Sequence, residues 1–376
     1  MEPFIYLRGL RHVDHSVFCV TDGQKFYYDP VFEINGYKIK VPYSSGQQVK
    51  RSIIESISNQ LAQERSPVSF IWKAPGLEEG EVLSLCDPQY YDQILGGWMH
   101  TAQKKDKKKD KGSEEQEEDQ DQGKSRTLKR RSPFSISAMR PLHPLLGGLE
   151  SENMTFDRSD RPNIPNKIIV RNSDGKQLSQ AEVDDLLSGT DRSLLRKWLK
   201  PGNRASGLFI YDVAIDLRTL FSVSTNQLEP ELSKEKIEEL KSKGWIESKN
   251  FYGACLVMPK TLRVKAIPAI ASALLNWRIT SNQARTFSLM ETLAIAISDN
   301  ANQLSGAIRA KLIDDGEKPK AKPIIDETAG ADVFVTLPCS GYIVTVNESV
   351  DALENAEQKL IELMSTFDYE NQISEV

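Results

Sequence analysis

The sequence predicts an α+β fold, in which strands and helices are mixed rather than repeated as regular βαβ units. Runs of β-branched and aromatic residues occur near both ends and in the middle of the chain. Amphipathic helical patterns lie between these runs at irregular intervals. A doubly wound parallel sheet would need a steady alternation of strands and helices, so the pattern favours α+β.

The composition is that of a globular protein with a sizeable core. Of the 376 residues, 39% are hydrophobic and 27% are charged, and the formal net charge is −5. The chain has no run of ~18 apolar residues and no signal-peptide pattern. Its four cysteines are far apart and form no CxxC pair, so they indicate neither a metal site nor a redox motif. We expect a cytoplasmic protein with no membrane partner, metal or cofactor.

The first 63 residues contain the clearest elements. Residues 4–20 predict one long strand or a bent pair, in which Gly9 marks a bulge. Asn35-Gly36 predicts the turn of a hairpin. Apolar residues at helical spacing predict a helix over 47–63.

Two segments in the middle of the chain differ from the rest. Residues 103–131 are charged and of low complexity, and they contain too few apolar side chains to offset the entropy of ordering. We predict a disordered insertion there, either a solvated loop or a contact for a polyanion. Residues 132–175 are rich in Pro, Gly and Asn and predict a protrusion outside the core, because long irregular segments are usually functional or mobile.

The second half of the chain carries further mixed elements. We expect helices over 180–200, with a break near Ser188-Gly189, and over 233–245, 262–276 and 350–366. We expect strands over 207–221, after residue 288, and over 331–337 and 341–346.

Evidence for catalysis is weak. No HExxH, GxSxG, Walker A or GxGxxG motif occurs. His12 and His15 lie three apart on a predicted strand and therefore point to opposite faces, which does not suit one metal ion. Either histidine could still act as the general base of RNA cleavage. Asp157 and Asp160 could bind a metal ion, but neighbouring arginines favour an exposed ion-pair loop. We assign no catalytic residue.

The segment "PYSSGQQVKR" ends a predicted strand and begins the first helix. A helix N-terminus offers free N–H groups and partial positive charge, and it binds phosphate well where glycine lets the backbone approach. A capping box of Ser45 and Gln48 would explain one serine, but it requires neither the second serine, the glycine nor the two cations. Both interpretations stay open. The candidate phosphate ligands are Ser44, Ser45, Gly46, Gln47, Lys50 and Arg51.

A second polar cluster is "NWRITSNQARTFS" at residues 276–288. Amides and arginines around Trp277 suit contacts to RNA backbone and bases. The alternative is a polar turn with Trp277 buried in the core. The candidate RNA contacts are Arg278, Asn282, Gln283 and Arg285.

The third cluster lies in the predicted protrusion. Met154 and Phe156 occur among arginines that include Arg158. Apolar side chains flanked by arginines could form a wedge between bases. They could equally dock on a neighbouring subunit.

In the order and spacing of these motifs, the chain resembles the Cas-seven family of CRISPR proteins, in its DevR-like branch of the RAMP superfamily. The two sharpest points of resemblance are "PYSSGQQVKR" and "NQARTFS". The charged insertion at 103–131 fits no family pattern. Members of the family are backbone subunits of the type I Cascade surveillance complex.

The resemblance implies a modified RRM-like or ferredoxin-like palm with inserted finger and thumb elements. Residues 1–100 would form the first part of the palm with the phosphate-binding helix start, and 101–132 a disordered charged insertion. Residues 133–206 would form the thumb or finger insertion, and 207–376 the rest of the palm with a C-terminal helix.

The resemblance also implies a non-catalytic role. Several copies would form a helical filament along one crRNA, together with other Cascade subunits, and present the guide for pairing with target DNA. The helix-start ligands would hold guide phosphates, and the 276–288 cluster would contact the same strand. Arg8 and His12 would face the RNA groove. The thumb wedge would be formed by Met154, Phe156 and Arg158.

Two other functions compete with this one. One is a RAMP-type endoribonuclease that processes precursor crRNA through His12 or His15. Such nucleases usually carry a glycine-rich loop near the C-terminus, for which "LPCSGYIV" is a poor match. The other is a regulatory protein-binding module that binds no RNA.

Overall fold

The structure is a computed structural model in which most of the chain is described. The described residues are 2–18, 25–34, 36–69, 72–73, 76–77, 84–100, 127–152, 155–157, 169–189, 196–198, 202–281, 283, 286–313, 319–345 and 347–373.

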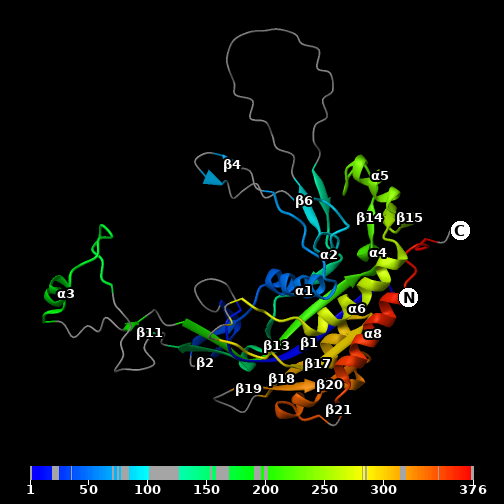
Figure 1. The fold of residues 1–376 in the computed structure, drawn as a ribbon. Coiled ribbons are helices and arrows are strands. Elements are labelled where there is room, and N and C mark those ends of the chain that lie inside the picture. The colour runs from blue at the N-terminus through cyan, green and yellow to red at the C-terminus, as the bar shows by residue number, and fades with distance from the viewer. Residues whose placement is uncertain are drawn as a thin grey trace, which may run out of the picture.

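A mixed sheet forms the centre of the molecule (Figure 1). Strand β1 (Phe4–Ser16) is an inner strand, which pairs antiparallel with β13 (Gly202–Asp216) on one side and β17 (Thr292–Ser298) on the other. The sheet continues to β10 (Gly147–Glu152) beyond β13, and to β20 (Asp332–Thr336) and β21 (Glu348–Ser349) beyond β17. Only the β20–β21 pair among these is parallel. The α+β class is therefore consistent with the structure.

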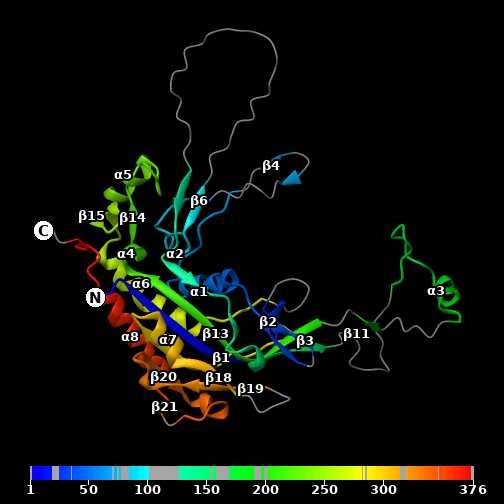
Figure 2. The ribbon, with the colours of Figure 1, turned by 180° about the vertical axis from the view of Figure 1, so that it is seen from behind.

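Each face of the sheet packs against a different set of elements (Figures 1 and 2). On one face, Leu7 of β1 shares a core with helices α1 (Gly46–Gln60), α6 (Lys260–Asn276) and α8 (Ala352–Thr366). On the other face, Leu10 shares a smaller core with α7 (Ala301–Ala307), the 3₁₀ turn η3 (Leu337–Gly341) and hairpin strand β18 (Ile308–Ile313), which pairs with β19 (Lys320–Ile325). Successive residues of a strand alternate between faces, which places Leu7 and Leu10 apart.

The remaining elements surround this centre. The strands are β2 (Phe26–Ile34), β3 (Tyr37–Pro42), β4 (Trp72–Lys73), β5 (Gly76–Leu77), β6 (Trp98–His100), β7 (Leu128–Arg130), β8 (Phe134–Ile136), β9 (Arg140–Pro141), β11 (Thr155–Asp157), β12 (Arg196–Trp198), β14 (Ser222–Ser224), β15 (Ile246–Asn250) and β16 (Gly253–Val257). The helices and turns are α2 (Tyr91–Gly96), η1 (Pro144–Leu146), α3 (Gln180–Leu187), α4 (Leu217–Leu220), α5 (Lys234–Ser242) and η2 (Glu327–Ala329). Among the described helices, none has the length and apolarity needed to cross a membrane.

Several sequence predictions are confirmed. Helices α1, α5, α6 and α8 lie where the sequence predicted them, and β2 and β3 form the expected hairpin. Of the cysteines, Cys86, Cys255 and Cys339 are buried free thiols. Cys19 lies outside the described residues.

The predicted protrusion over 132–175 is wrong for its first part. Strands β8, β9 and β10 all pair with β13, and Phe134 and Met139 are buried in the core. The predicted thumb insertion, 133–206, therefore contributes strands to the central sheet. These strands are only two to six residues long, which is too short for a periodic signal.

Other boundaries also differ from the predictions. The prediction of disorder over 103–131 is wrong for its last part, because Leu128–Arg130 forms β7. Residues 103–126 lie outside the described residues. The strand predicted over 341–346 is replaced by η3 and a turn in its described residues. The break predicted near Ser188-Gly189 is confirmed, because α3 ends at Leu187, but Arg196–Trp198 forms β12 rather than helix. Gly9 marks no bulge. It pairs in register with Tyr211, and a Cβ there would lie 2.3 Å from the Tyr211 ring, so glycine is needed for packing.

Candidate nucleic-acid interface

The start of α1 is built by a cap and a close backbone contact. Ser45 is the N-cap, and its hydroxyl accepts a hydrogen bond from the Gln48 N–H at 3.2 Å. The Ser44 backbone exchanges hydrogen bonds with Met139. A Cβ on Gly46 would lie 2.7 Å from the carbonyl oxygen of Ile136, so this glycine lets the helix pack on β8. Gly46 thus has a packing role that the capping interpretation lacked. The Ser44 side chain is buried and lies outside the surface that the helix start presents.

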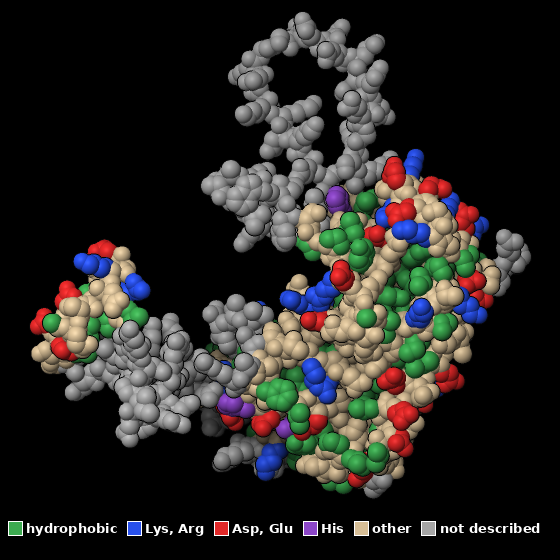
Figure 3. Space-filling view, viewed as in Figure 1, with side chains coloured by type: hydrophobic (Ala, Val, Ile, Leu, Met, Phe, Trp, Pro, Cys, Tyr) green, Lys and Arg blue, Asp and Glu red, His purple; other side chains and the backbone are tan. Residues whose placement is uncertain are grey.

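Beside the first turns of α1 lies an open hollow of about 370 Å³. Lys and Arg side chains gather in this region of the surface in the space-filling view (Figure 3). The hollow is lined by Gln47, Lys50, Arg51, Ile54, Arg65, Asp92 and Gly96. We call it the α1 hollow.

Lys50 is the most constrained cation of the α1 hollow. Its ammonium donates a hydrogen bond to the Gly96 carbonyl oxygen at 3.0 Å, at the C-terminal end of α2. Partial burial lowers the pKa of Lys50 to about 8. An anion in the hollow would oppose this shift, because it stabilises the charged form.

The other side chains leave the α1 hollow positive. Arg51 is exposed and makes no ion pair with any described residue. Arg65 lies 3.7 Å from Glu55, and both side chains are more than two-fifths exposed, so solvent weakens this pair. The Asp92 carboxylate accepts hydrogen bonds from the Ser66 backbone and hydroxyl. Three cations therefore face one carboxylate that is already hydrogen-bonded.

Arg65 is the member that sequence reasoning missed. It lies beyond the end of α1, so helical periodicity gave no signal for it. Ala62, in the turn that follows α1, has a left-handed backbone with φ 48°. The chain beyond this turn carries Arg65 to the hollow that Lys50 and Arg51 also line.

Arg8 and His12 lie apart from the α1 hollow. The Arg8 guanidinium binds both carboxylate oxygens of Asp212, at 2.6 and 3.1 Å, and donates to the Ile308 carbonyl. Arg8 shares its strand face with Leu10 and therefore lies on the side of the sheet away from α1. Arg140 also lies 3.6 Å from Asp212, so the two arginines share one carboxylate. A role in the RNA groove stays a prediction for both residues.

His12 belongs to a small cluster with a carboxylate and a phenol. Its ring stacks on Tyr342 at a centroid distance of 4.2 Å. The Nδ1 atom lies 3.0 Å from the Tyr342 hydroxyl and 3.4 Å from a carboxylate oxygen of Glu291. His15 lies 3.4 Å from a different carboxylate, that of Glu150. The two histidines thus have separate partners.

The 276–288 cluster divides between core and surface. Trp277 is buried, with the guanidinium of Arg11 4.1 Å from its ring centroid, which confirms the core alternative for this residue. Arg278 is exposed and donates to the Trp277 carbonyl at 2.9 Å. Gln283 donates to the Val17 carbonyl at 2.8 Å, which ties the loop to the end of β1.

The other predicted residues lie at the limits of the described chain. Asn282, Arg285, Met154 and Arg158 fall outside the described residues. Phe156 lies in β11, opposite Lys197 of β12, but its side chain is not among those described. Their proposed contacts stay predictions.

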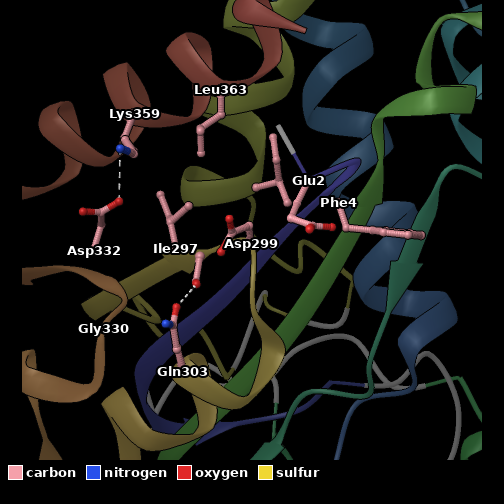
Figure 4. A pocket seen from close by; sticks show the side chains of 11 residues that line it. Glu2, Phe4, Ile297, Asp299, Gln303, Gly330, Asp332, Lys359 and Leu363 are labelled. Carbon is pink, nitrogen blue, oxygen red and sulfur yellow. Dashed lines mark hydrogen bonds and ion pairs between the residues drawn. The ribbon is translucent and has the colours of Figure 1, made fainter. Parts of the chain in front are cut away.

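A second cavity, of about 260 Å³, has the opposite charge (Figure 4). Glu2, Asp299 and Asp332 line it together with Lys359, whose ammonium lies 3.2 Å from Asp332. Three carboxylates against one paired lysine repel phosphate. The α1 hollow is therefore the better candidate for an anionic ligand.

No protein-family model matches the chain, and no curated protein matches it in sequence. Among solved structures, it is similar to a chain of a "CRISPR RNA-guided surveillance complex", with a TM-score of 0.35 and 10% identity over 96% of this chain and 84% of that chain. It is also similar to a chain of a "CRISPR RNA-guided surveillance complex, pre-nicking", with a TM-score of 0.42 and 9% identity over 96% of this chain and 89% of that chain.

Proposed function

We propose that the chain is a non-catalytic backbone subunit of a CRISPR surveillance complex, which holds the phosphate backbone of crRNA. The α1 hollow carries the proposal, because Gln47, Lys50 and Arg51 from the family-like motif line it together with Arg65. Cations beside hydrogen-bond donors hold a phosphate backbone without reading its sequence. That property is what a guide-holding subunit needs, because base pairing supplies the specificity.

The finer parts of the proposal rest on the sequence resemblance. The central sheet would be a modified RRM-like palm, and copies of the chain would follow one another along the guide. A repeated head-to-tail contact generates such an open helical array. Each copy adds its own contacts, so the array holds RNA more tightly than one copy does.

The first test is purification of the protein from cells that express a CRISPR array. We expect bound RNA of uniform length with repeat-derived ends. The variant Lys50→Ala/Arg51→Ala/Arg65→Ala should lose most of this RNA, because it removes the three cations of the α1 hollow.

The matched control removes three exposed lysines elsewhere, as Lys249→Ala/Lys260→Ala/Lys265→Ala. It should keep its RNA. Equal loss in both variants would mean that only overall charge matters. A wild-type protein free of RNA would instead favour a protein-binding module.

One observation favours a nuclease as the second candidate. Glu291 and Tyr342 both approach Nδ1 of His12, and an oriented imidazole can act as a general base through its other nitrogen. If His12 acts in this way, the purified protein should cleave a precursor RNA that contains the repeat, without added metal ions. His12→Ala should abolish the cleavage, and His15→Ala should not. Intact precursor in the wild-type reaction would exclude this candidate.

A further inference from the structure

The β18–β19 hairpin has one apolar face and one cationic face. In the register of the pair, Ile308, Ala310 and Leu312 lie opposite Ile325, Pro323 and Ala321. The alternate residues point to the other face. They are Arg309, Lys311 and Ile313, opposite Ile324, Lys322 and Lys320.

The apolar face is explained by packing. Ile308 is fully buried in the smaller core, and Ile325 and Leu146 pack against that core as partly buried side chains. The base of the hairpin is therefore fixed to the central sheet. The cationic face lies on the other side of the hairpin.

On the cationic face, two lysines lie next to each other and repel, and no carboxylate of the described residues is paired with either of them. Lys311 and Lys322 are direct cross-strand partners, and both are exposed. Such partners have Cβ atoms about 4.5–5.5 Å apart, and like charges at this spacing destabilise a hairpin. Arg309 has Asp326 at 3.0 Å, whereas no carboxylate of the described residues forms an ion pair with Lys311 or Lys322.

We propose that the Lys311–Lys322 pair binds the phosphate backbone of double-stranded nucleic acid. Lysine is a mobile point charge that neutralises phosphate without sequence preference. Lys311 and Lys322 lie directly opposite each other on the two strands, so both ammonium groups can reach the same stretch of a phosphate backbone.

The absence of aromatic residues decides between a duplex and a single strand. Proteins that hold single strands combine cations with aromatic side chains on which bases stack. The six residues of this face are basic or aliphatic. The face is therefore suited to a backbone whose bases are already paired.

The duplex contact is separate from the α1 hollow. Helix α1 packs on the face of the sheet that carries Leu7, whereas β18 packs on the face that carries Leu10. In both ribbon views, α1 and the β18–β19 hairpin lie on opposite sides of β1 and β13 (Figures 1 and 2). One protein can therefore hold a guide strand and a duplex at the same time. The inference does not depend on the proposed guide contact.

The test is binding of the full chain to a random-sequence DNA duplex of about 25 base pairs, measured by fluorescence anisotropy between roughly 50 and 200 mM salt. Each phosphate contact contributes about 0.9 to the slope of log K against log salt. Lys311→Glu/Lys322→Glu should reduce the slope by about 1.8 if each lysine neutralises one phosphate. A control with the same charge change, Lys249→Glu/Lys265→Glu, should leave it unchanged.

Lys311→Glu alone separates binding from folding. This variant replaces a like-charge pair by an opposite-charge pair, so its Tm should not fall while its duplex affinity does. Unchanged duplex affinity in the folded double variant would overturn the proposal. Preference for a single strand of the same length, or equal competition by poly-glutamate, would overturn it as well.

These outcomes are independent of the guide contact. The hairpin variants should retain any co-purified RNA, and Lys50→Ala/Arg51→Ala/Arg65→Ala should retain the duplex contact of the hairpin. Loss of duplex binding in the α1-hollow variant alone would place the duplex in the hollow and overturn the inference.

Discussion

Arg11 shows how a charge can be part of a protein core. It is fully buried, and its guanidinium donates to the carbonyl oxygens of Leu275 and Trp277 at 2.9 and 2.7 Å. These carbonyls lie at the C-terminal end of α6, where the helix dipole is negative. The rings of Tyr211 and Trp277 supply cation–π contacts. Burial lowers the pKa of Arg11 to about 10, which leaves it charged at neutral pH.

We expect Arg11→Ala to destabilise the protein by about 3 kcal/mol or more, because it leaves a cavity and removes one hydrogen bond from each of the Leu275 and Trp277 carbonyls. Urea denaturation followed by tryptophan fluorescence would measure this loss. Arg218→Ala, at a partly exposed arginine, should cost less. An Arg11→Ala protein of wild-type stability would contradict this account of the core.

Lys50 predicts a pH dependence of RNA retention. Its pKa of about 8 lies below the ordinary value of 10.5, so the ammonium deprotonates between pH 7 and 9. RNA should therefore bind more weakly at pH 9 than at pH 7, and Lys50→Arg should bind equally at both. Filter binding at constant ionic strength would measure the difference. Equal pH dependence of both proteins would exclude Lys50 as its source.

The lowered pKa of Lys50 affects RNA binding and folding stability in opposite directions. As the pH rises, RNA binding should weaken, whereas the contribution of Lys50 to folding stability should increase. The unfolded chain binds more protons than the folded chain between about pH 8 and 10.5, so the contribution of Lys50 to stability rises with pH in that window. The cost of burying its charge is fully present below pH 8.

The residue types that line the α1 hollow could in part be predicted from the sequence, but the partners of the predicted site residues could not. The run from Ser44 to Arg51 predicted an anion site, and the structure places Gln47, Lys50 and Arg51 of this run around the α1 hollow. Anion binding there stays a prediction. Nothing in the sequence around Arg8 indicated Asp212, which is 204 residues away. The presence of Arg65 in the α1 hollow could likewise not be predicted, because it depends on the turn after α1.

At the level of elements, long periodic segments were predictable and short paired strands were not. Helix α1 has Val49, Ile53 and Ile57 on one buried stripe, and its own sequence contains that signal. Strands β8 and β9 are stabilised by pairing with β13, which lies more than 60 residues further along the chain. The local sequence of β8 and β9 therefore does not indicate that they pair with β13.

Gly46 gives a prediction at this scale. In Gly46→Ala the new Cβ would lie 2.7 Å from a backbone oxygen of β8, so either α1 or β8 must move. We expect a loss of about 1–3 kcal/mol in unfolding free energy, as for other overpacked sites. Gly341→Ala, where no atom lies within 4 Å of the new Cβ, is the control. A neutral Gly46→Ala would show that this contact does not constrain α1.

At the scale of the whole molecule, the net charge of −5 conceals separate basic and acidic regions. The α1 hollow and the β18–β19 hairpin are basic, whereas the cavity beside Glu2 is acidic. Composition alone could not have revealed this division. It arises because the fold brings together cations from α1 and from the chain that follows it.

Salt dependence tests the role of the whole α1 hollow. For a single strand, each neutralised phosphate contributes about 0.7 to the slope of log K against log salt. Lys50→Ala/Arg51→Ala/Arg65→Ala should therefore lower the slope for RNA by about 2. A slope that does not change would mean that the guide is held elsewhere on the protein.

The inner position of β1 has a consequence for biosynthesis. This strand is made well before its neighbours β13 and β17, which begin only at Gly202 and Thr292. At about 5–20 residues per second, a ribosome needs roughly 10–40 s to reach the first of them. During that interval the nascent chain carries an apolar strand with both edges unpaired, which is a site for aggregation or for chaperone binding. Strand β1 therefore pairs on both edges only after β13 and β17 have left the ribosome.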